Sequence, residues 1–185
     1  MEKPDRLNET YALIDRYVML TFLVRLLTTH STKSAEEFNS SVYDIDFAEL
    51  GLSEEEVSDL GVTPTVTMLR KYQSRIIELA EQASVEVFGH LVAFSKEDRL
   101  TIMEHVDSKV ADYINKIGVC QDDYLTLVVA IDESTKGSDN TTTRELGKKA
   151  KASFNRLYEY NIICQNYSNI SSYLRGLTKN SAMIK

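Results

Sequence analysis

The feature that most constrains this chain is how rarely its backbone is interrupted. Only 7 of its 185 residues are glycine and 2 are proline. These two residue types mark most turns, so their scarcity disfavours a fold of many short strands and favours long helices. With 43% apolar and 26% charged residues, the chain has an ordinary globular composition and can bury a sizeable core. The sequence therefore predicts an all-α, single-domain bundle of five to seven helices.

Apolar residues recur at intervals of three and four along most of the chain, which is the spacing of amphipathic helices. The first predicted helix covers residues 5–29, and a weaker helical stretch follows over residues 34–51. Ser53 and Glu56 have the spacing of a capping box, in which each side chain accepts a backbone N–H of the other residue. Gly61 is suited to end the short helix that they open.

A long helix is predicted next. Thr63 and Pro64 are suited to be its N-cap and its first residue, and the helix extends to about residue 94. Ser95 begins the following helix, and Gly118 is predicted to end it. The residues expected to face the core from the long helix are Val66, Leu69, Tyr72, Ile76, Leu79, Ala83, Val87 and Leu91.

Residues 124–133 form a shorter predicted helix, capped by Asp122 or Asp123. This segment is apolar nearly all round, which is typical of a helix at the centre of a bundle. Its β-branched residues leave a strand over residues 125–131 open as an alternative.

The C-terminal part begins with residues 136–142 (KGSDNTT), whose composition predicts a flexible loop. A basic helix over about residues 143–175 completes a predicted helical domain of residues 1–177. Residues 178–185 are expected to form a frayed tail.

Charge divides the chain into an acidic body and a basic tail. Residues 1–140 carry 13 basic and 26 acidic side chains, whereas residues 141–185 carry 8 basic and 2 acidic ones. This asymmetry indicates either that the tail docks on its own acidic body or that it binds an acidic partner. The basic side chains cluster on one side of the predicted C-terminal helix, and the candidate partner-binding residues are Arg144, Lys148, Lys149, Lys151 and Arg156.

Two pairs of acidic residues form an alternative candidate site. Glu78 and Glu81 lie three residues apart on one predicted helix, and Glu104 and Asp107 have the same spacing on the next. Two such pairs on adjacent antiparallel helices could hold Mg²⁺ and orient a triphosphate. The layout resembles the ExxE…ExxD pattern of the MazG-like all-α nucleotide pyrophosphohydrolases, although Ile77 stands where those enzymes usually carry a further Glu. The resemblance implies a Mg²⁺-dependent hydrolase with these four carboxylates as metal ligands.

Motifs for cofactors and for other catalytic sites do not appear. The glycines are scattered singly, so no Gly-rich phosphate-binding loop is present, and Cys120 and Cys164 each lack the nearby second Cys of a zinc site. We expect buried, reduced thiols and no cofactor. The polar start of the chain, and an apolar stretch at residues 17–27 that Thr21 and Arg25 interrupt, predict no signal peptide and no transmembrane segment. We therefore expect a cytoplasmic protein, in its own cell or in a host cell.

These observations favour a non-enzymatic helical interaction or assembly protein, such as an adaptor, an immunity-type partner or a virus-encoded structural component. Its basic C-terminal helix would contact an acidic protein partner, its own acidic body or a second copy of the chain. The first alternative is a helical protein that binds nucleic acid, because basic residues interleaved with tyrosines can follow a phosphate backbone and stack on bases. The second alternative is the MazG-like hydrolase.

Overall fold

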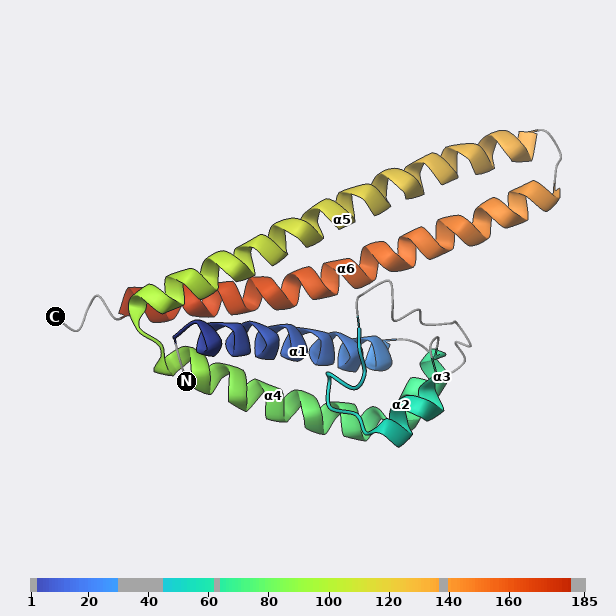
Figure 1. The fold of residues 1–185 in the computed structure, drawn as a ribbon. Coiled ribbons are helices and arrows are strands. Elements are labelled where there is room, and N and C mark those ends of the chain that lie inside the picture. Colours follow the sequence, from blue (N-terminus) through green and yellow to red (C-terminus); the bar gives the residue numbers. More distant parts are fainter. Residues whose placement is uncertain (1–2, 30–44, 62–63, 137–139, 181–185) are drawn as a thin grey trace. The chain divides into compact units, whose positions relative to one another are not determined.

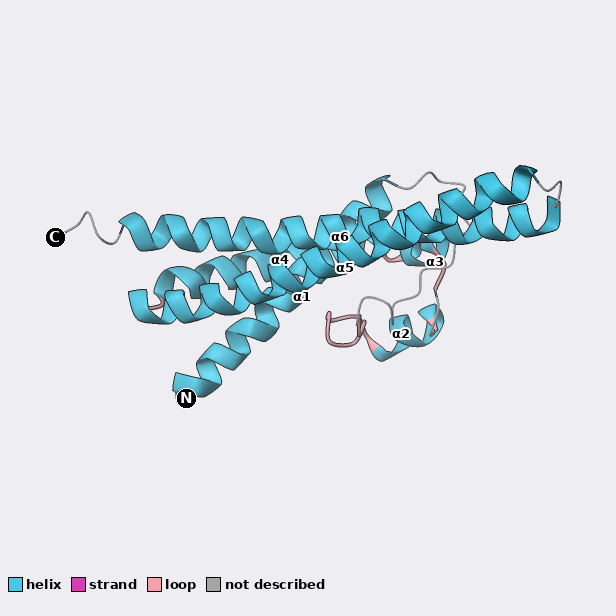
Figure 2. Cartoon of the chain, turned by 90° about the horizontal axis from the view of Figure 1, so that it is seen from above, coloured by secondary structure: helices cyan, strands magenta, loops and turns pink. Residues whose placement is uncertain are grey.

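The computed structural model describes residues 3–29, 45–61, 64–136 and 140–180, and these residues form six helices (Figure 1). Figure 2 shows the described residues as helices with a few loop segments, so the predicted all-α class is confirmed. The helices are α1 (Lys3–Thr29), α2 (Glu54–Leu60), α3 (Val66–Lys71), α4 (Gln73–Ala93), α5 (Lys96–Lys136) and α6 (Asn140–Asn180).

The chain divides into two compact units, and the two longest helices contribute to both. The first unit comprises Met1–His105 together with Ile170–Lys185, and the second comprises Val106–Asn169. The second unit is therefore made of the C-terminal part of α5 and the N-terminal part of α6.

The core of the first unit lies between α1 and α4, which are each other's main packing partners. In both helices, apolar residues at spacings of three and four are buried, as expected for amphipathic helices. At most 2% of the surface is exposed at Ile14, Val18, Phe22, Leu26, Ile76, Leu79, Ala83, Val87 and Leu91.

Three predicted helix boundaries of this unit are confirmed. Ser53 and Glu56 form the capping box at the start of α2, and Gly61 ends that helix with a φ of 65°, which favours glycine. At the start of α5, the Ser95 hydroxyl accepts the N–H of Asp98 at 3.1 Å. Local side-chain chemistry thus sets where these helices begin and end.

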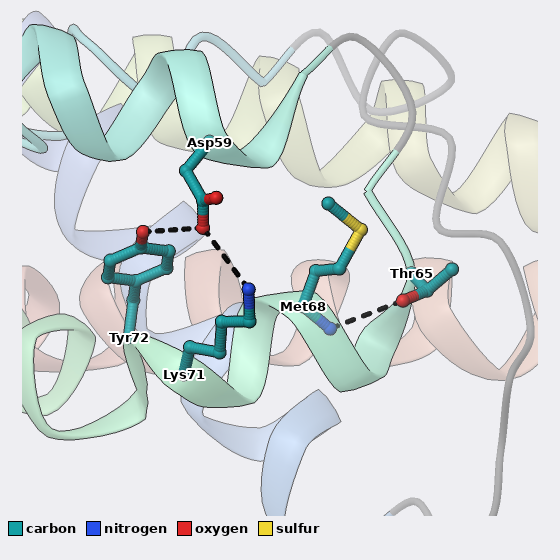
Figure 3. A network of polar contacts seen from close by, with 5 residues as sticks. All are labelled: Asp59, Thr65, Met68, Lys71 and Tyr72. Carbon is teal, nitrogen blue, oxygen red and sulfur yellow. Dashed lines mark hydrogen bonds and ion pairs between the residues drawn. The ribbon is translucent and has the colours of Figure 1, made fainter.

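The helix predicted to begin at Thr63 and Pro64 starts two residues later. Thr65 is the N-cap of α3, because its hydroxyl accepts the N–H of Met68 at 3.2 Å (Figure 3). Thr63 lies outside the described residues, and Pro64 precedes the helix instead of forming its first turn.

The predicted long helix is also divided in two at Tyr72, which separates α3 from α4. The Tyr72 hydroxyl donates to the Asp59 carboxylate of α2 at 2.7 Å, and the Lys71 ammonium lies 3.4 Å from the same oxygen (Figure 3). These contacts connect the break in the helix to α2. Apolar periodicity carries no information about them, because the Val66-to-Leu91 stripe runs through Tyr72 without a change of phase.

Two further boundaries differ from the predictions. Of the weak helical stretch predicted over residues 34–51, residues 34–44 lie outside the described residues, and residues 47–51 form turns. At the other end, α6 begins at Asn140 and continues to Asn180, so it takes in part of the predicted loop and of the predicted frayed tail. Residues 181–185 lie outside the described residues.

The second unit is an antiparallel helical hairpin, in which α5 and α6 run in opposite directions (Figure 1). Ser134 of α5 and Thr143 of α6 share a hydroxyl hydrogen bond of 2.8 Å. Farther along, the Tyr113 ring lies 5.8 Å from the rings of both Tyr160 and Tyr167. These contacts fix the register of the antiparallel pair: later residues of α5 lie beside earlier residues of α6.

Buried and half-buried residues of the hairpin recur every seven positions, which is the heptad pattern of coiled coils. In α5 the inward a positions are 110, 117, 124 and 131, and the d positions are 106, 113, 120, 127 and 134. In α6 the a positions are 143, 150, 157 and 164, and the d positions are 146, 153, 160 and 167. Most of the remaining positions, b, c, e, f and g, face outward or along the edges of the seam, whereas Ile162 and Ile163 at f and g positions of α6 are buried.

The structure overturns the predicted division of α5. The helix does not end at Gly118, neither Asp122 nor Asp123 caps a new one, and residues 125–131 are helical. The segment predicted to be central is instead exposed, because Leu125 retains 53% of its accessible surface and Val129 retains 58%. In a hairpin of two helices only one face of each can be covered by the other, so a helix that is apolar all round leaves apolar surface uncovered.

Candidate interaction surface on the helical hairpin

The five basic residues predicted to bind a partner all lie on the part of α6 that belongs to the hairpin, and all five are exposed. Among the described residues, no acidic side chain forms an ion pair with Arg144, Lys148, Lys149 or Arg156. The exposed charge of these four side chains is therefore available to a partner.

Two of these basic residues line a groove along one edge of the hairpin. Lys149 and Arg156 are seven residues apart at g positions, and Asp123 reaches the groove from a g position of α5. The groove has a volume of about 370 Å³, and its other lining residues are Thr126, Leu127, Ala152 and Ser153. One acidic and two basic side chains give the groove charges of both signs, and Leu127 and Ala152 add apolar surface.

The opposite edge of the hairpin is apolar, and sequence reasoning missed it. Its e and b positions carry five large apolar or aromatic residues that retain between 41% and 56% of their accessible surface. The Phe154 ring packs 5.6 Å from the ring of Tyr124, an a-position residue of α5, which places Phe154 at the seam. We call this set the apolar face, and its members are Ile114, Leu125, Val128, Phe154 and Tyr158.

A signal for the apolar face is present in the sequence. Ile114, Gly118, Leu125 and Val128 fall at spacings of three, four and seven, parallel to the inward stripe of α5 and one position around the helix from it. A second stripe of this kind is typical of a helix that contacts more than one neighbour. It could be read only after the continuity of α5 was known, because a stop at Gly118 interrupts it.

Both cysteines lie in the hairpin and are free. Burial raises the pKa of the Cys120 thiol, while the positive charge of Arg156 acts in the opposite direction. Burial also raises the pKa of the Cys164 thiol, whose Sγ lies 3.9 Å from the carbonyl of Val110. The predicted burial holds for Cys120, whereas Cys164 is half-buried. Raised pKa values keep both groups as thiols near neutral pH, the less nucleophilic form.

The four carboxylates of the alternative metal site do not come together. Within the described ranges, no three His, Cys, Asp or Glu side chains are grouped so as to hold a metal ion. Glu78, Glu81 and Glu104 are exposed, and Glu78 pairs with Arg75 on its own helix at 3.4 Å. The geometry that a Mg²⁺-dependent hydrolase needs is not formed by these residues.

Comparison with known proteins found no matching family, no matching curated protein and no matching solved structure. Across the described residues, no helix has an apolar run of sufficient length to cross a membrane.

Proposed function

We propose that this chain is a non-enzymatic helical interaction or assembly protein and that its contact surface is the hairpin of residues 106–169. The observation that carries the proposal is the coincidence of exposed apolar and exposed basic side chains on one small unit. Contiguous exposed apolar surface is uncommon on monomeric soluble proteins and marks sites of association. The basic side chains next to it would give the contact its charge preference.

The partner that fits this surface is a protein with an acidic contact region. Arg144, Lys148 and Lys151 lie at b and f positions of α6, next to the apolar face. A protein partner could cover the apolar side chains and neutralise these charges in one contact. As part of the same proposal the protein acts in the cytoplasm, where its two free cysteines would stay reduced.

Nucleic acid is the second candidate partner, and the groove at the g edge is the observation that favours it. Lys149 and Arg156 face this groove with a spacing of seven residues, which suits two phosphates of one strand. Asp123 in the same groove and the formal charge of −7 on the whole chain oppose it. The protein partner is therefore the better-supported reading.

The two candidates are separated by a binding experiment on the full chain with two polyanions. Polyglutamate represents an acidic protein surface, and single-stranded oligothymidylate represents nucleic acid. Fluorescence anisotropy of each labelled probe would be recorded at rising salt for the wild type, for Lys148→Glu with Lys149→Glu, and for the control pair Lys96→Glu with Lys179→Glu. The control changes the net charge equally at exposed lysines outside the hairpin.

We expect salt-sensitive binding of polyglutamate that the hairpin pair weakens at least about tenfold more than the control pair does, because one strong contact is worth about 1.4 kcal/mol or more. Preferential binding of oligothymidylate with the same variant dependence would support the nucleic-acid candidate instead. Equal effects of the two variant pairs would show that only net charge matters, which contradicts a contact surface on the hairpin.

A further inference from the structure

We propose that the apolar face of the hairpin is the contact surface for a second copy of this chain, and that two hairpins pair there into a four-helix bundle. This inference rests on the proposed function, because it takes the hairpin as the interaction surface and names the partner. It is carried by the pattern of apolar positions and by the charges that border them.

The pattern of apolar positions indicates how many neighbours the helices have. A helix that packs in a two-stranded coiled coil needs apolar residues only at a and d, whereas a helix in a bundle of four has a third apolar position in each heptad. In α5, the apolar residues at this third position, which is e, are Ile114 and Val128, and Leu125 lies at the neighbouring b position. In α6, Phe154 is at e. Both helices therefore carry apolar residues beyond the a and d positions, as helices of a four-helix bundle do, while the hairpin supplies two helices.

The charges that border the apolar face differ between the two helices. In the hairpin, α5 carries six acidic and three basic side chains over residues 106–136, and α6 carries five basic and two acidic ones over residues 140–169. Next to the apolar face, α5 presents Asp122 and Asp132, and α6 presents Arg144 and Lys151. Asp132 also pairs with Lys136 on its own helix. The surface is thus acidic along one border and basic along the other.

Such a surface is complementary to itself. A two-fold axis parallel to the helices places α5 of each copy against α6 of the other, so the acidic border meets the basic border twice. An axis perpendicular to the helices would place α5 against α5 and oppose like charges. An unrelated acidic protein would match only the α6 border, and nucleic acid would be repelled by the α5 border, so a second copy is the partner that satisfies both.

The register of the hairpin then predicts which residues meet. A rotation about an axis parallel to the helices does not change the height of a residue along that axis. A residue of α5 is therefore expected next to the same α6 residues that it faces within its own hairpin, but on the other copy. The Ser134–Thr143 hydrogen bond sets that level near the hairpin tip. Asp132 of one copy is therefore expected beside Arg144 of the other, and Leu125 beside the Lys151 stem and Phe154.

The test measures the mass of the full chain by sedimentation equilibrium over a range of concentrations. The wild type of 21.0 kDa per chain is expected to form a dimer. Val128→Lys, on the apolar face, is expected to raise the dissociation constant at least about tenfold. The matched control Val85→Lys changes a valine that is 77% exposed on α4 of the first unit and is expected to dimerise as the wild type does.

The predicted ion pair is tested by charge exchange. Asp132→Arg and Arg144→Asp are each expected to weaken the dimer, and the two changes together are expected to restore it. Circular dichroism of each variant checks that the helices remain, since both residues are exposed. If the double variant restores the dissociation constant of the dimer, the two residues meet between copies. A contact between them within one hairpin would leave that dissociation constant unchanged.

Each contrary result has a distinct meaning. A wild type that stays monomeric at every concentration, yet still binds polyglutamate through the hairpin, would overturn this inference and leave the proposed function standing. A dimer that Val128→Lys and Val85→Lys affect equally would show that copies associate elsewhere and would also overturn it. A monomer that binds neither polyanion would contradict the inference and the proposed function together.

Discussion

The contact between Tyr72 and Asp59 makes the stability of the first unit depend on pH. The Asp59 carboxylate raises the pKa of the Tyr72 hydroxyl to about 12, while the hydrogen bond from Tyr72 and the charge of Lys71 lower the pKa of Asp59. The folded state thus favours a neutral phenol and an ionised carboxylate. The contribution to stability is complete between about pH 4 and pH 10, the unfolded pKa values of the two groups. It is lost below this window as Asp59 protonates, and above it as Tyr72 ionises.

Replacing Tyr72 with Phe removes the hydroxyl and keeps the ring. We predict that Tyr72→Phe lowers the midpoint of thermal unfolding at pH 7, and that its difference from the wild type becomes smaller as the pH falls through the lowered pKa of Asp59. Tyr173→Phe is the control, because Tyr173 is 36% exposed in the same unit and the change keeps its ring contact with Phe88, so the midpoint should stay unaltered. A difference for Tyr72→Phe that stays constant down to acid pH would contradict the role given to the carboxylate.

Burial of Leu79 allows a second test at the scale of one side chain. Leu79 is 2% exposed on α4, in the stripe that packs toward α1. Leu79→Ala should lower the free energy of unfolding by about 2–5 kcal/mol, because it removes buried methyl groups and leaves a cavity. Val85→Ala on the same helix should change it by less than about 0.5 kcal/mol, because Val85 is 77% exposed. Urea unfolding of both variants measures the contrast, and equal effects would mean that the phase of α4 is wrong.

At the scale of secondary-structure elements, the continuity of α5 through Gly118 can be tested directly. No atom outside the local backbone lies within 4 Å of the place where a Cβ would stand. Gly118→Ala should therefore raise the free energy of unfolding by about 0.5–1 kcal/mol, because alanine is the better helix former. Gly118→Pro should lower it by about 3 kcal/mol or more. If the helix ended here with a left-handed glycine, alanine would instead be destabilising by about 1 kcal/mol or more.

The first unit was largely predictable because local and tertiary signals agree there. Ser53, Gly61 and Ser95 mark boundaries by their own side chains or backbone freedom, and the apolar stripes of α1 and α4 become the core. The prediction of one long helix failed at Tyr72 because of a tertiary contact, since the partner of the Tyr72 hydroxyl is Asp59 on another helix. A signal that depends on such a contact is not visible in a single stretch of sequence.

The hairpin was harder to predict because its inward positions hold small and polar residues. Cys120, Ser134 and Ser153 lie at d positions, where a search for apolar heptads passes over them. Gly118, predicted to end a helix, and Asp122, predicted to cap the start of the next, both face outward. At an exposed helix position glycine costs only about 1 kcal/mol, and water solvates the carboxylate. For the basic candidates, the sequence alone could not decide between an exposed helix face and one packed on the acidic body, and the structure shows all five side chains exposed. The apolar face could not be found, because a segment that is apolar all round predicts burial wherever its neighbours are unknown.

At the scale of the whole molecule, the division into two units implies that the hairpin can be shortened without unfolding the rest. Removing residues 121–134 and 143–156 deletes two heptads from each helix and keeps the a and d positions in register. The deleted part includes Leu125, Val128 and Phe154 of the apolar face. We predict that the shortened chain unfolds cooperatively, with a thermal midpoint near that of the wild type, and that it is monomeric because the contact surface for the second copy is gone.

Removing residues 143–185 is the contrasting deletion, and here we predict loss of the cooperative transition. This deletion takes away the part of α6 that carries Tyr167, Ile170 and Leu174, each at most 1% exposed, and so removes core residues of both units. Differential scanning calorimetry of the two deletions tests whether the first unit needs the outer heptads of the hairpin in order to fold. If removal of residues 121–134 and 143–156 also abolishes the cooperative transition, the heptads near the tip contribute to the stability of the first unit, and the two units fold as one.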